Sequence, residues 1–311
     1  MQTSKIEFRK EREFTTVLSD SFAFLKQNFK SLFLSILLII GPVILISGLA
    51  YSLLQTYLLN NMFSGSLLFS QNYFMYMGLI YLLMIINGVL VNSVVFNYMC
   101  LYNEKPAGEK ILVSEVGSRV WRSLGRVLGS LAIIIFLFVI VIIVAALIGI
   151  GFGSMGAFGI VIAILALVFG GLIYGPILTY FISAAFFVVV RDKVTIFSAF
   201  AHTRRYLSGN FWWTWLIMVV ALIGLSVLQI LFNLPASILS MAETFTRVRE
   251  ASSGNIAGGE HSVLLIVFYT IGRVLTSCSF ALLHLVCAFN FLSHEEKHEG
   301  QGMLGRIDEI K

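Results

Sequence analysis

The sequence has few charged side chains. Only 12% of its 311 residues are Asp, Glu, Lys or Arg, about half of the ~25% that is usual in soluble domains. A soluble fold of this length must cover its surface with polar groups, and this chain has too few of them. The shortage excludes a disordered chain, a nucleic-acid-binding domain and an ordinary soluble enzyme. We therefore expect no nucleic-acid partner.

Cysteine is also scarce. The chain has three, Cys100, Cys278 and Cys287, and so small and odd a number predicts no disulfide framework. Cys278 and Cys287 lie on one expected helix, ~13 Å apart along its axis, which is too far for a disulfide bond. The first 30 residues are charged, and no cleavage site follows an early apolar run. We therefore do not predict a cleaved signal peptide.

Apolar residues are abundant and gather in long runs. Hydrophobic residues make up 58% of the chain, and a membrane-spanning helix needs ~20 of them in succession. Six stretches are long enough: 32–51, 73–95, 128–150, 158–190, 211–232 and 262–292. We predict an all-α fold, an integral membrane bundle of six transmembrane helices arranged as three hairpins.

Two helix boundaries need interpretation. The stretch 158–190 would form a helix ~50 Å long, against a membrane core of ~30 Å. We interpret it as one helix that bends at Gly170-Gly171 and Gly175-Pro176, with its end at 183–190 packed on protein; a re-entrant piece is the alternative. After the fifth stretch, we expect Pro235 to start a separate amphipathic helix.

Lysine and arginine lie on alternate sides of the six stretches. Of 21 such residues, 18 fall in the N-terminal segment, the loops after the second and fourth stretches, and the C-terminal tail. The loops after the first and third stretches have none, and the loop after the fifth has two. The positive-inside rule then places both termini in the cytoplasm. We predict a multi-pass protein of the cytoplasmic (inner) membrane.

Each of the first three basic segments contains an amphipathic sequence, here called an interfacial helix, that leads into the next apolar stretch. The first has an apolar face of Phe14, Val17, Phe22, Leu25, Phe29 and Leu32. The second repeats this spacing 99 residues later, with Val113, Val116, Trp121, Leu124, Leu128 and Leu131. The third matches at an offset of 182, where Tyr206, Leu207 and Phe211 correspond to Phe24, Leu25 and Phe29.

These offsets predict three pseudo-repeats, 14–101, 111–190 and 194–293, within one transmembrane domain. Each would consist of a cytoplasmic interfacial helix and a two-helix hairpin, and a short cytoplasmic tail, 294–311, would follow. The alternative is that any basic amphipathic helix at a membrane surface has this pattern, because the interface requires it.

Few polar side chains interrupt the apolar stretches. Arg273 lies about ten residues into the sixth stretch, and no stretch contains Asp or Glu. Arg273 could extend toward the membrane surface, hydrogen-bond an amide of a neighbouring helix, or bind an anion in a cavity. The intramembrane polar candidates are Arg273, His284, Asn87, Asn92 and Gln229.

Two patterns match enzyme motifs. The segment from His294 to His298 reads H-E-x-x-H, which on a helix can hold zinc. Its charged middle residues and hydrophilic surroundings predict instead a solvated helix end. Gly151–Gly156 reads G-x-G-x-x-G, but no strand precedes it, so it indicates helix packing rather than a dinucleotide site. We predict no enzyme, no catalytic residue, no metal and no cofactor.

Several segments together resemble a known group of proteins. They are Leu25-x-x-Asn28-Phe29, Gly41-Pro42, 121–126, 203–211 and the tail 290–310. The chain is similar here to bacterial polytopic proteins that include the membrane domain preceding some glycerophosphodiester phosphodiesterases and the YciC-like inner-membrane proteins. The resemblance implies a multi-span inner-membrane module with no catalytic residues. The chain has no room for the phosphodiesterase domain, so that activity is not implied.

We expect a non-enzymatic membrane protein that binds lipid headgroups or takes part in envelope assembly with a membrane-protein partner. Anionic headgroups would meet its basic segments at the cytoplasmic face. The candidate headgroup residues are Lys26, Lys30, Arg119, Arg122, Arg126, Arg204 and Arg205. The alternative is a transporter of a lipid or small anionic solute through a cavity near Arg273, and a third interpretation is a metalloenzyme using His294 and His298.

Overall fold

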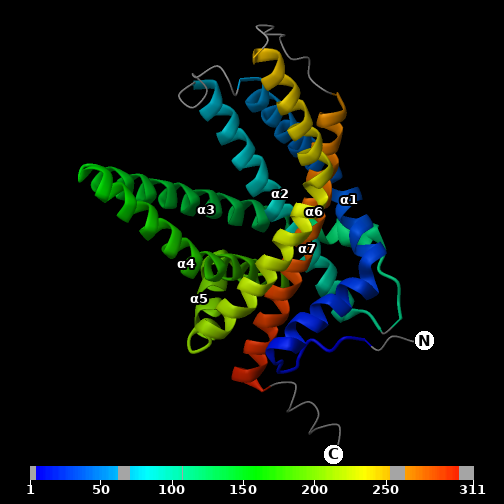
Figure 1. Ribbon diagram of the computed structural model, residues 1–311. Coiled ribbons are helices and arrows are strands. Elements are labelled where there is room, and N and C mark those ends of the chain that lie inside the picture. The colour runs from blue at the N-terminus through cyan, green and yellow to red at the C-terminus, as the bar shows by residue number, and fades with distance from the viewer. Residues whose placement is uncertain (1–4, 62–70, 107, 253–262, 301–311) are drawn as a thin grey trace, which may run out of the picture. The chain divides into compact units, whose positions relative to one another are not determined.

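A computed structural model describes residues 5–61, 71–106, 108–252 and 263–300 of the chain. Over these residues the protein forms seven helices and no strand (Figure 1). The helices are α1 (Phe14–Asn61), α2 (Gln71–Glu104), α3 (Val113–Gly153), α4 (Gly156–Asp192), α5 (Ile196–Leu207), α6 (Phe211–Ser252) and α7 (Val263–Glu299). The predicted all-helical fold class is confirmed for the described residues.

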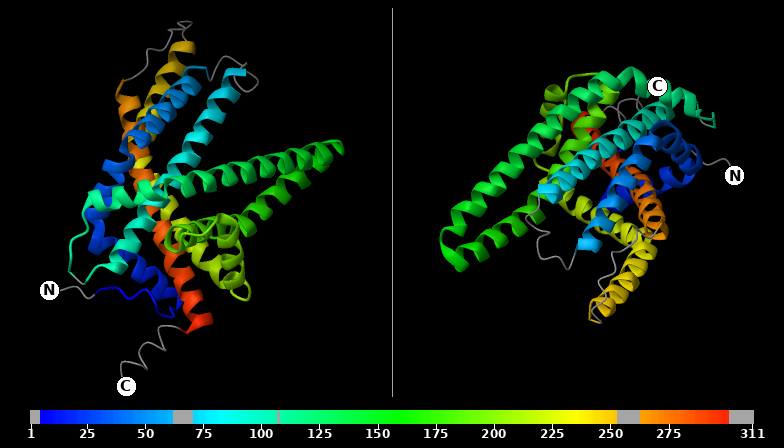
Figure 2. Two further views of the ribbon diagram at one scale, coloured as in Figure 1. Left: turned by 180° about the vertical axis from the view of Figure 1, so that it is seen from behind. Right: turned by 90° about the horizontal axis from the view of Figure 1, so that it is seen from above.

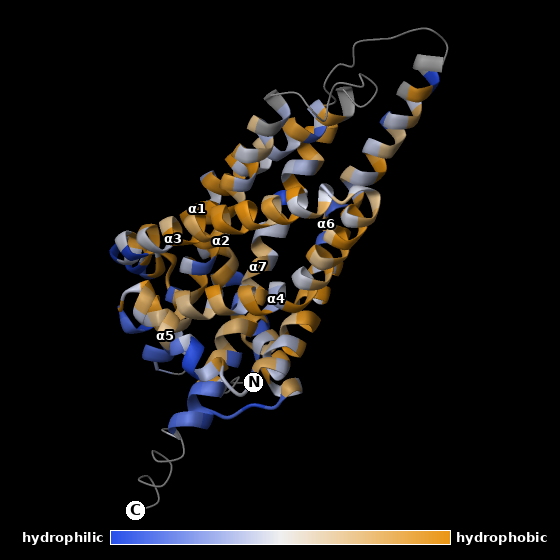
Figure 3. Cartoon of the chain, turned by 90° about the vertical axis from the view of Figure 1, so that its left-hand side faces the viewer, coloured by the Kyte–Doolittle hydropathy of each residue, from blue (hydrophilic) through white to orange (hydrophobic). Residues whose placement is uncertain are grey.

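Every helix except α5 is long and apolar enough to cross a membrane, judged by length and composition. Five of the six predicted stretches lie wholly within one of these helices, and the sixth begins one residue before α7. Hydrophobic residues, orange in Figure 3, run along the long helices. The prediction of six candidate spans is confirmed.

The helix boundaries settle both questions of interpretation. Helix α4 is a single helix that contains Pro176, and its end at 183–190 is buried throughout, as predicted. Pro235, in contrast, starts no helix but lies inside α6, so that prediction is wrong. Proline removes the N–H that would donate to the Leu231 carbonyl, and polar side chains bond to other carbonyls nearby. The Asn233 amide donates to the Gln229 carbonyl at 2.7 Å, and the Ser237 hydroxyl to the Asn233 carbonyl at 3.0 Å.

The chain divides into two compact units, which we call the basic unit and the arginine-273 unit. The basic unit comprises residues 1–35, 92–223 and 282–311, and the arginine-273 unit comprises 36–91 and 224–281. Within the basic unit, α3 and α4 connect through Ser154 and Met155 and pack against each other. Figure 2 shows them side by side in both of its views.

The core of the basic unit is aromatic. Residues 92–100 of α2, 183–190 of α4 and 282–294 of α7 are all buried. The rings of Phe96 and Phe187 lie 5.2 Å apart, those of Phe187 and Phe291 6.0 Å apart, and those of Phe24 and Phe289 5.8 Å apart. Aromatic side chains bury large apolar areas, so these contacts anchor the helix ends that carry the basic residues.

The predicted apolar faces of the interfacial helices are partly wrong. Phe22 and Phe29 are more than half exposed, and so are Trp121 and Leu128 at the offset of 99. The positions that face the protein include small polar side chains, such as Ser21 and Ser123, which a pattern of large apolar residues does not include. The large side chains point away from the protein, where a membrane suits them better than water does.

The burial pattern itself recurs at both offsets. Val17, Ser21 and Phe24 are buried, as are Val116, Val120 and Ser123 at the offset of 99. At the offset of 182, Ala199, Thr203 and Tyr206 are buried as well. Side chains three and four residues apart share one helix face. Each of the three helices therefore turns the corresponding face toward protein.

Candidate functional site

Some cations of the basic unit are fully engaged by the protein. The Arg12 side chain is buried, with Nε 2.8 Å from Asp20 Oδ2 and the guanidinium 4.9 Å from the Phe289 ring centre. Burial lowers the pKa of Arg12, and Asp20 opposes that shift. The Arg191 guanidinium bonds both carboxylate oxygens of Glu295, at 2.5 and 2.6 Å. These two arginines hold the fold together and offer no free charge to a ligand.

Other cations line a cavity of about 700 Å³ between α2 and α3, next to the end of α4. We call it the arginine cavity. Its lining residues are Asn97, Leu101, Glu104, Ser114, Glu115, Ser118, Arg119, Arg122, Ser123, Arg126, Val190 and Lys193. Three of the seven predicted headgroup residues, Arg119, Arg122 and Arg126, therefore come together here.

The arginines of this cavity differ in what they bind. The Arg119 guanidinium bonds both carboxylate oxygens of Glu104, at 2.5 and 2.7 Å. Arg122 and Arg126 form no ion pair within the described part of the chain. Two buried polar residues also line the cavity, where the Asn97 amide donates to the Ser123 hydroxyl at 3.3 Å. The cavity thus combines polar walls with two arginines that lack a counter-ion.

Lys193 adds a further cation at the end of α4. It caps that helix in the left-handed conformation, with φ of 58°, and is the sole non-glycine residue at positive φ in the described ranges. A side chain other than glycine is strained by about 1–2 kcal/mol in this conformation. The left-handed residue ends α4 beside the arginine cavity, so the lysine side chain joins the lining.

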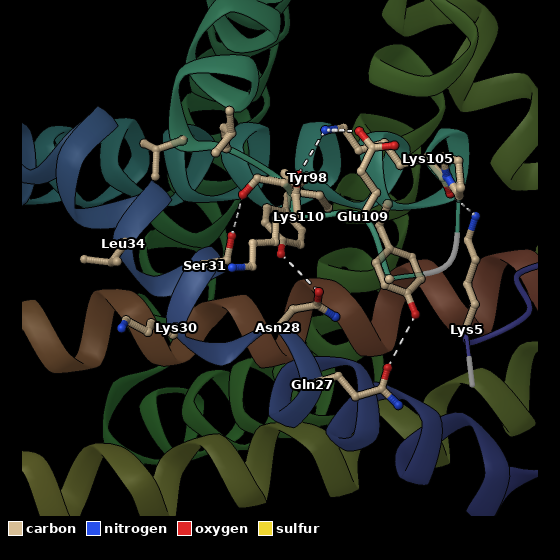
Figure 4. A pocket seen from close by; sticks show the side chains of 16 residues that line it. Lys5, Gln27, Asn28, Lys30, Ser31, Leu34, Tyr98, Lys105, Glu109 and Lys110 are labelled. Atoms are coloured by element: carbon tan, nitrogen blue, oxygen red, sulfur yellow. Dashed lines mark hydrogen bonds and ion pairs between the residues drawn. The ribbon is translucent and has the colours of Figure 1, made fainter. Parts of the chain in front are cut away.

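A second cavity, of about 560 Å³, has four lysines among its sixteen lining residues and lies between α1, the end of α2 and the loop before α3 (Figure 4). We call it the lysine cavity. Its cations are Lys5, Lys30, Lys105 and Lys110. Lys5 Nζ donates to the carbonyls of Asn103 and Lys105 at 2.8 and 2.7 Å.

Lys105 is engaged as well. Its Nζ lies 2.9 Å from carboxylate oxygens of both Glu109 and Glu115. Hydrogen bonds to Glu115 and Glu109 raise the pKa of Lys105. Two of the four lysines are therefore already held by protein oxygens.

The remaining predicted headgroup residues lie elsewhere. Lys30 lines the lysine cavity, whereas Lys26, Arg204 and Arg205 are exposed and line neither cavity. Sequence reasoning missed Lys5, Lys105, Lys110 and Lys193. These residues lie in loops and at helix ends, where no periodic pattern indicates which way a side chain points.

In the arginine-273 unit, the guanidinium of Arg273 lies 5.4 Å from the Tyr51 ring centre. Its Nε is buried and has no hydrogen-bond partner among the described residues. The Asn87 amide instead donates to the hydroxyls of Ser47 and Ser277, each at 3.0 Å. The cavity described in this unit, about 350 Å³, is lined by Gly41, Pro42 and apolar side chains, and Arg273 does not line it.

The amide partners proposed for Arg273 receive no support. The amide oxygen of Asn87, which lies in the same unit as Arg273, is buried and has no hydrogen-bond partner among the described residues. Asn92 itself belongs to the basic unit. Gln229 is partly exposed, and its backbone carbonyl accepts a hydrogen bond from Asn233.

The histidines do not form a metal site in the described ranges, where no group of three or more potential ligands occurs. His284 is buried, with Nδ1 3.0 Å from the Ser183 hydroxyl. His294 is only 3% exposed, and its Nε2 lies 2.9 Å from the Thr214 hydroxyl, whereas His298 is exposed. The prediction of a solvated helix end at 294–298 is therefore wrong for His294 and Glu296, which are buried on the inner face of α7, whereas Lys297 and His298 are exposed.

Comparisons with protein-family models, with curated proteins and with solved structures found no match to this chain. The resemblance to YciC-like proteins and to the phosphodiesterase membrane domain stays a prediction.

Proposed function

We propose that the chain is a non-enzymatic inner-membrane protein that binds anionic lipid headgroups at its cytoplasmic face. The observation that carries the proposal is the arginine cavity, in which Arg122 and Arg126 have no counter-ion from the described protein. Arg122 is exposed and Arg126 partly exposed, so both guanidinium groups are accessible to an anion, with which they form charge-assisted hydrogen bonds. The membrane surface supplies such anions as lipid headgroups.

The depth of the cavity along α3 supports this ligand. Arg126 precedes the apolar part of α3, which begins at residue 128, by ~3 Å along the helix axis. From there α3 is largely exposed, with Phe136, Leu147 and Ile150 each more than 60% exposed. Trp121 is 71% exposed, and tryptophan favours the headgroup region of a bilayer. A lipid phosphate at this level would meet Arg122 and Arg126.

The proposal includes the three-hairpin arrangement with interfacial helices and cytoplasmic termini. The recurrence of buried positions at offsets of 99 and 182 supports three related units. Surface cations such as Arg204 and Arg205 would add general attraction of ~1 kcal/mol each to an anionic membrane. The cavity would add a defined place for one headgroup.

Native mass spectrometry of the full chain, released from a bilayer of mixed composition, tests lipid binding. We expect retained anionic phospholipid at a higher fraction than in the bulk membrane. Retention of lipids in their bulk proportions would contradict the proposal.

Labelling of a new cysteine tests the orientation. All three native cysteines are buried, so Ser118→Cys in the arginine cavity should be the main site for a membrane-impermeant maleimide. We expect labelling in inverted inner-membrane vesicles and none in intact spheroplasts. Labelling in spheroplasts would place the basic face outside and overturn the cytoplasmic assignment.

The second candidate is transport of a lipid or anionic solute near Arg273, favoured by the buried Nε without a partner. Arg273→Leu distinguishes the two, because that residue lies outside the arginine cavity. We expect the retained anionic lipid to be unchanged in Arg273→Leu. Its loss would favour the transporter.

A further inference from the structure

A comparison of the three interfacial helices shows which positions are the same in all of them and which belong to one helix alone. At the positions of Arg119, Arg122 and Arg126, the first helix carries Asp20, Ala23 and Gln27 at the offset of 99. The third helix, 83 residues after the second, carries His202 and Arg205 at the corresponding positions, and Gly209 follows its end. The buried positions correspond in all three helices, whereas the arginine cluster belongs to α3 alone. Ordinary anchoring at the interface therefore does not require this cluster.

The charges around the arginine cavity leave a positive excess. Its lining has four basic side chains, Arg119, Arg122, Arg126 and Lys193, and two acidic ones, Glu104 and Glu115. Glu104 is taken by Arg119 and Glu115 by Lys105. Arg122, Arg126 and Lys193 remain to meet a ligand. A phosphate monoester carries about −1.5 to −2 charges at neutral pH, whereas a phosphate diester carries one.

The spacing of the arginines suits a phosphate group. Arg122 and Arg126 are four residues apart on α3, so their side chains leave the same helix face about 5–6 Å apart. Each guanidinium presents a planar fork of N–H donors that fits two phosphate oxygens, which a lysine ammonium cannot do. Ser118 lies on the same wall and offers a hydroxyl donor, whereas the Ser123 hydroxyl already donates to the Val120 carbonyl at 2.9 Å. The cavity volume of about 700 Å³ leaves ample room for one headgroup.

We propose that the arginine cavity binds a phosphate monoester headgroup, with Arg122, Arg126 and Lys193 as its ligands, in preference to a phosphate diester. The simplest lipid of this class is phosphatidic acid, whose acyl chains would lie along the exposed apolar surface of α3. This inference rests on the proposed function and specifies which anionic headgroup is bound. General electrostatic attraction to anionic lipids would not distinguish a phosphate monoester from a diester.

The test uses the full chain in nanodiscs of phosphatidylcholine that contain either phosphatidic acid or phosphatidylglycerol with the same acyl chains. The lipid bound per protein is measured by native mass spectrometry for the wild type, for Arg122→Gln/Arg126→Gln, and for Arg204→Gln/Arg205→Gln. The last variant is a matched control, since it removes two exposed arginines that line neither cavity. A further arm adds inorganic phosphate to the wild-type sample.

We expect the wild type to prefer phosphatidic acid by about tenfold or more, which corresponds to one additional charge-assisted contact. Arg122→Gln/Arg126→Gln should abolish this preference, whereas the control should keep it and bind all anionic lipids somewhat less. If the natural ligand is a lipid headgroup, inorganic phosphate should displace little of the bound phosphatidic acid. If the natural ligand is a soluble phosphate monoester, inorganic phosphate should displace most of it.

Equal binding of both lipids by the wild type, or equal effects of the two double variants, would overturn the monoester site. Either outcome would leave general anionic-lipid binding intact. Failure of both anionic lipids to exceed phosphatidylcholine would overturn the proposed function as well. Thermal unfolding of each variant, compared with the wild type, identifies any loss that results from misfolding.

Discussion

The arginine cavity and the lysine cavity lie in the same unit and have similar sizes, about 700 and 560 Å³, yet the cations that they leave without an ion pair differ in kind. In the lysine cavity, Lys5 and Lys105 already bind carbonyl and carboxylate oxygens of the protein, whereas Lys30 and Lys110 have no ion pair among the described residues. In the arginine cavity, Arg122 and Arg126 bind none that the described residues provide. A basic lining is therefore not by itself a ligand site. What distinguishes the arginine cavity is that its unpaired cations include two guanidinium groups, whose planar forks of donors fit phosphate oxygens.

The largest expected effect comes from making the arginine cavity resemble the lysine cavity. Arg122→Lys/Arg126→Lys keeps both charges but removes the planar forks. We expect the preference for phosphatidic acid over phosphatidylglycerol to fall about tenfold while total anionic lipid stays nearly constant. The same nanodisc measurement reports both quantities. An unchanged preference would mean that charge alone selects the lipid and that the two cavities do not differ in kind.

Lowering the pH should weaken the preference by a smaller factor. A phosphate monoester takes up its second proton near pH 6, so between about pH 8 and about pH 5 it loses nearly one negative charge. Arginine stays protonated over this range, and the raised pKa of Lys105 keeps that lysine protonated too. We expect a decrease of about fivefold for phosphatidic acid and little change for phosphatidylglycerol. A parallel decrease for both lipids would point to a titrating protein group instead.

Releasing Arg119 from its partner should strengthen binding. Glu104→Gln removes the carboxylate that holds the Arg119 guanidinium, which adds a third arginine without a counter-ion. We expect phosphatidic acid to bind about threefold more tightly, in line with ~1 kcal/mol or less for one cation near the surface. Glu109→Gln in the lysine cavity is the control and should leave this affinity unchanged. Weaker binding in Glu104→Gln would show that Arg119 needs Glu104 to stay in place.

The smallest expected effect on lipid binding concerns Lys193, whose replacement should also change the stability of the protein. Lys193→Gly relieves the left-handed backbone strain and should raise the free energy of unfolding by about 1 kcal/mol. It should also weaken phosphatidic acid binding by about twofold to fivefold through loss of one cation. Lys193→Ala should reduce binding to the same extent without the gain in stability. A Lys193→Gly variant that binds normally would remove this lysine from the site.

Much of the fold could be predicted from the length and composition of the apolar stretches. Six long runs of apolar side chains require a membrane or an equally large apolar core; five fall wholly within one long helix, and the sixth begins one residue before α7. Predictions about individual side chains failed where the residue that buries or pairs the side chain is distant in sequence. Neither the burial of His294 nor the pairing of Arg191 with Glu295, 104 residues away, has a local signal. Pro235 failed for a different reason: a proline is common at the start of a helix, but here α6 continues through it.

The site shows the same limit. The spacing of Arg119, Arg122 and Arg126 placed all three on one helix face, and the arginine cavity includes all of them. The sequence could not indicate that Glu104 engages Arg119 and leaves the other two free, because that depends on how α2 packs against α3. Lys193 was missed because its position depends on a left-handed residue at the end of α4. Arg204 and Arg205 follow the same basic pattern but line no described cavity, so charge pattern alone did not separate a site from a surface.

The most direct measurement is a cryo-electron microscopy structure of the full chain in nanodiscs that contain phosphatidic acid. Our account predicts headgroup density in the arginine cavity, with phosphate oxygens within hydrogen-bonding distance, about 2.7–3.0 Å, of the guanidinium groups of Arg122 and Arg126. The density should be absent in Arg122→Gln/Arg126→Gln. An ordered headgroup beside Lys30 and Lys110 or beside Arg273, with none at Arg122 and Arg126, would contradict the account.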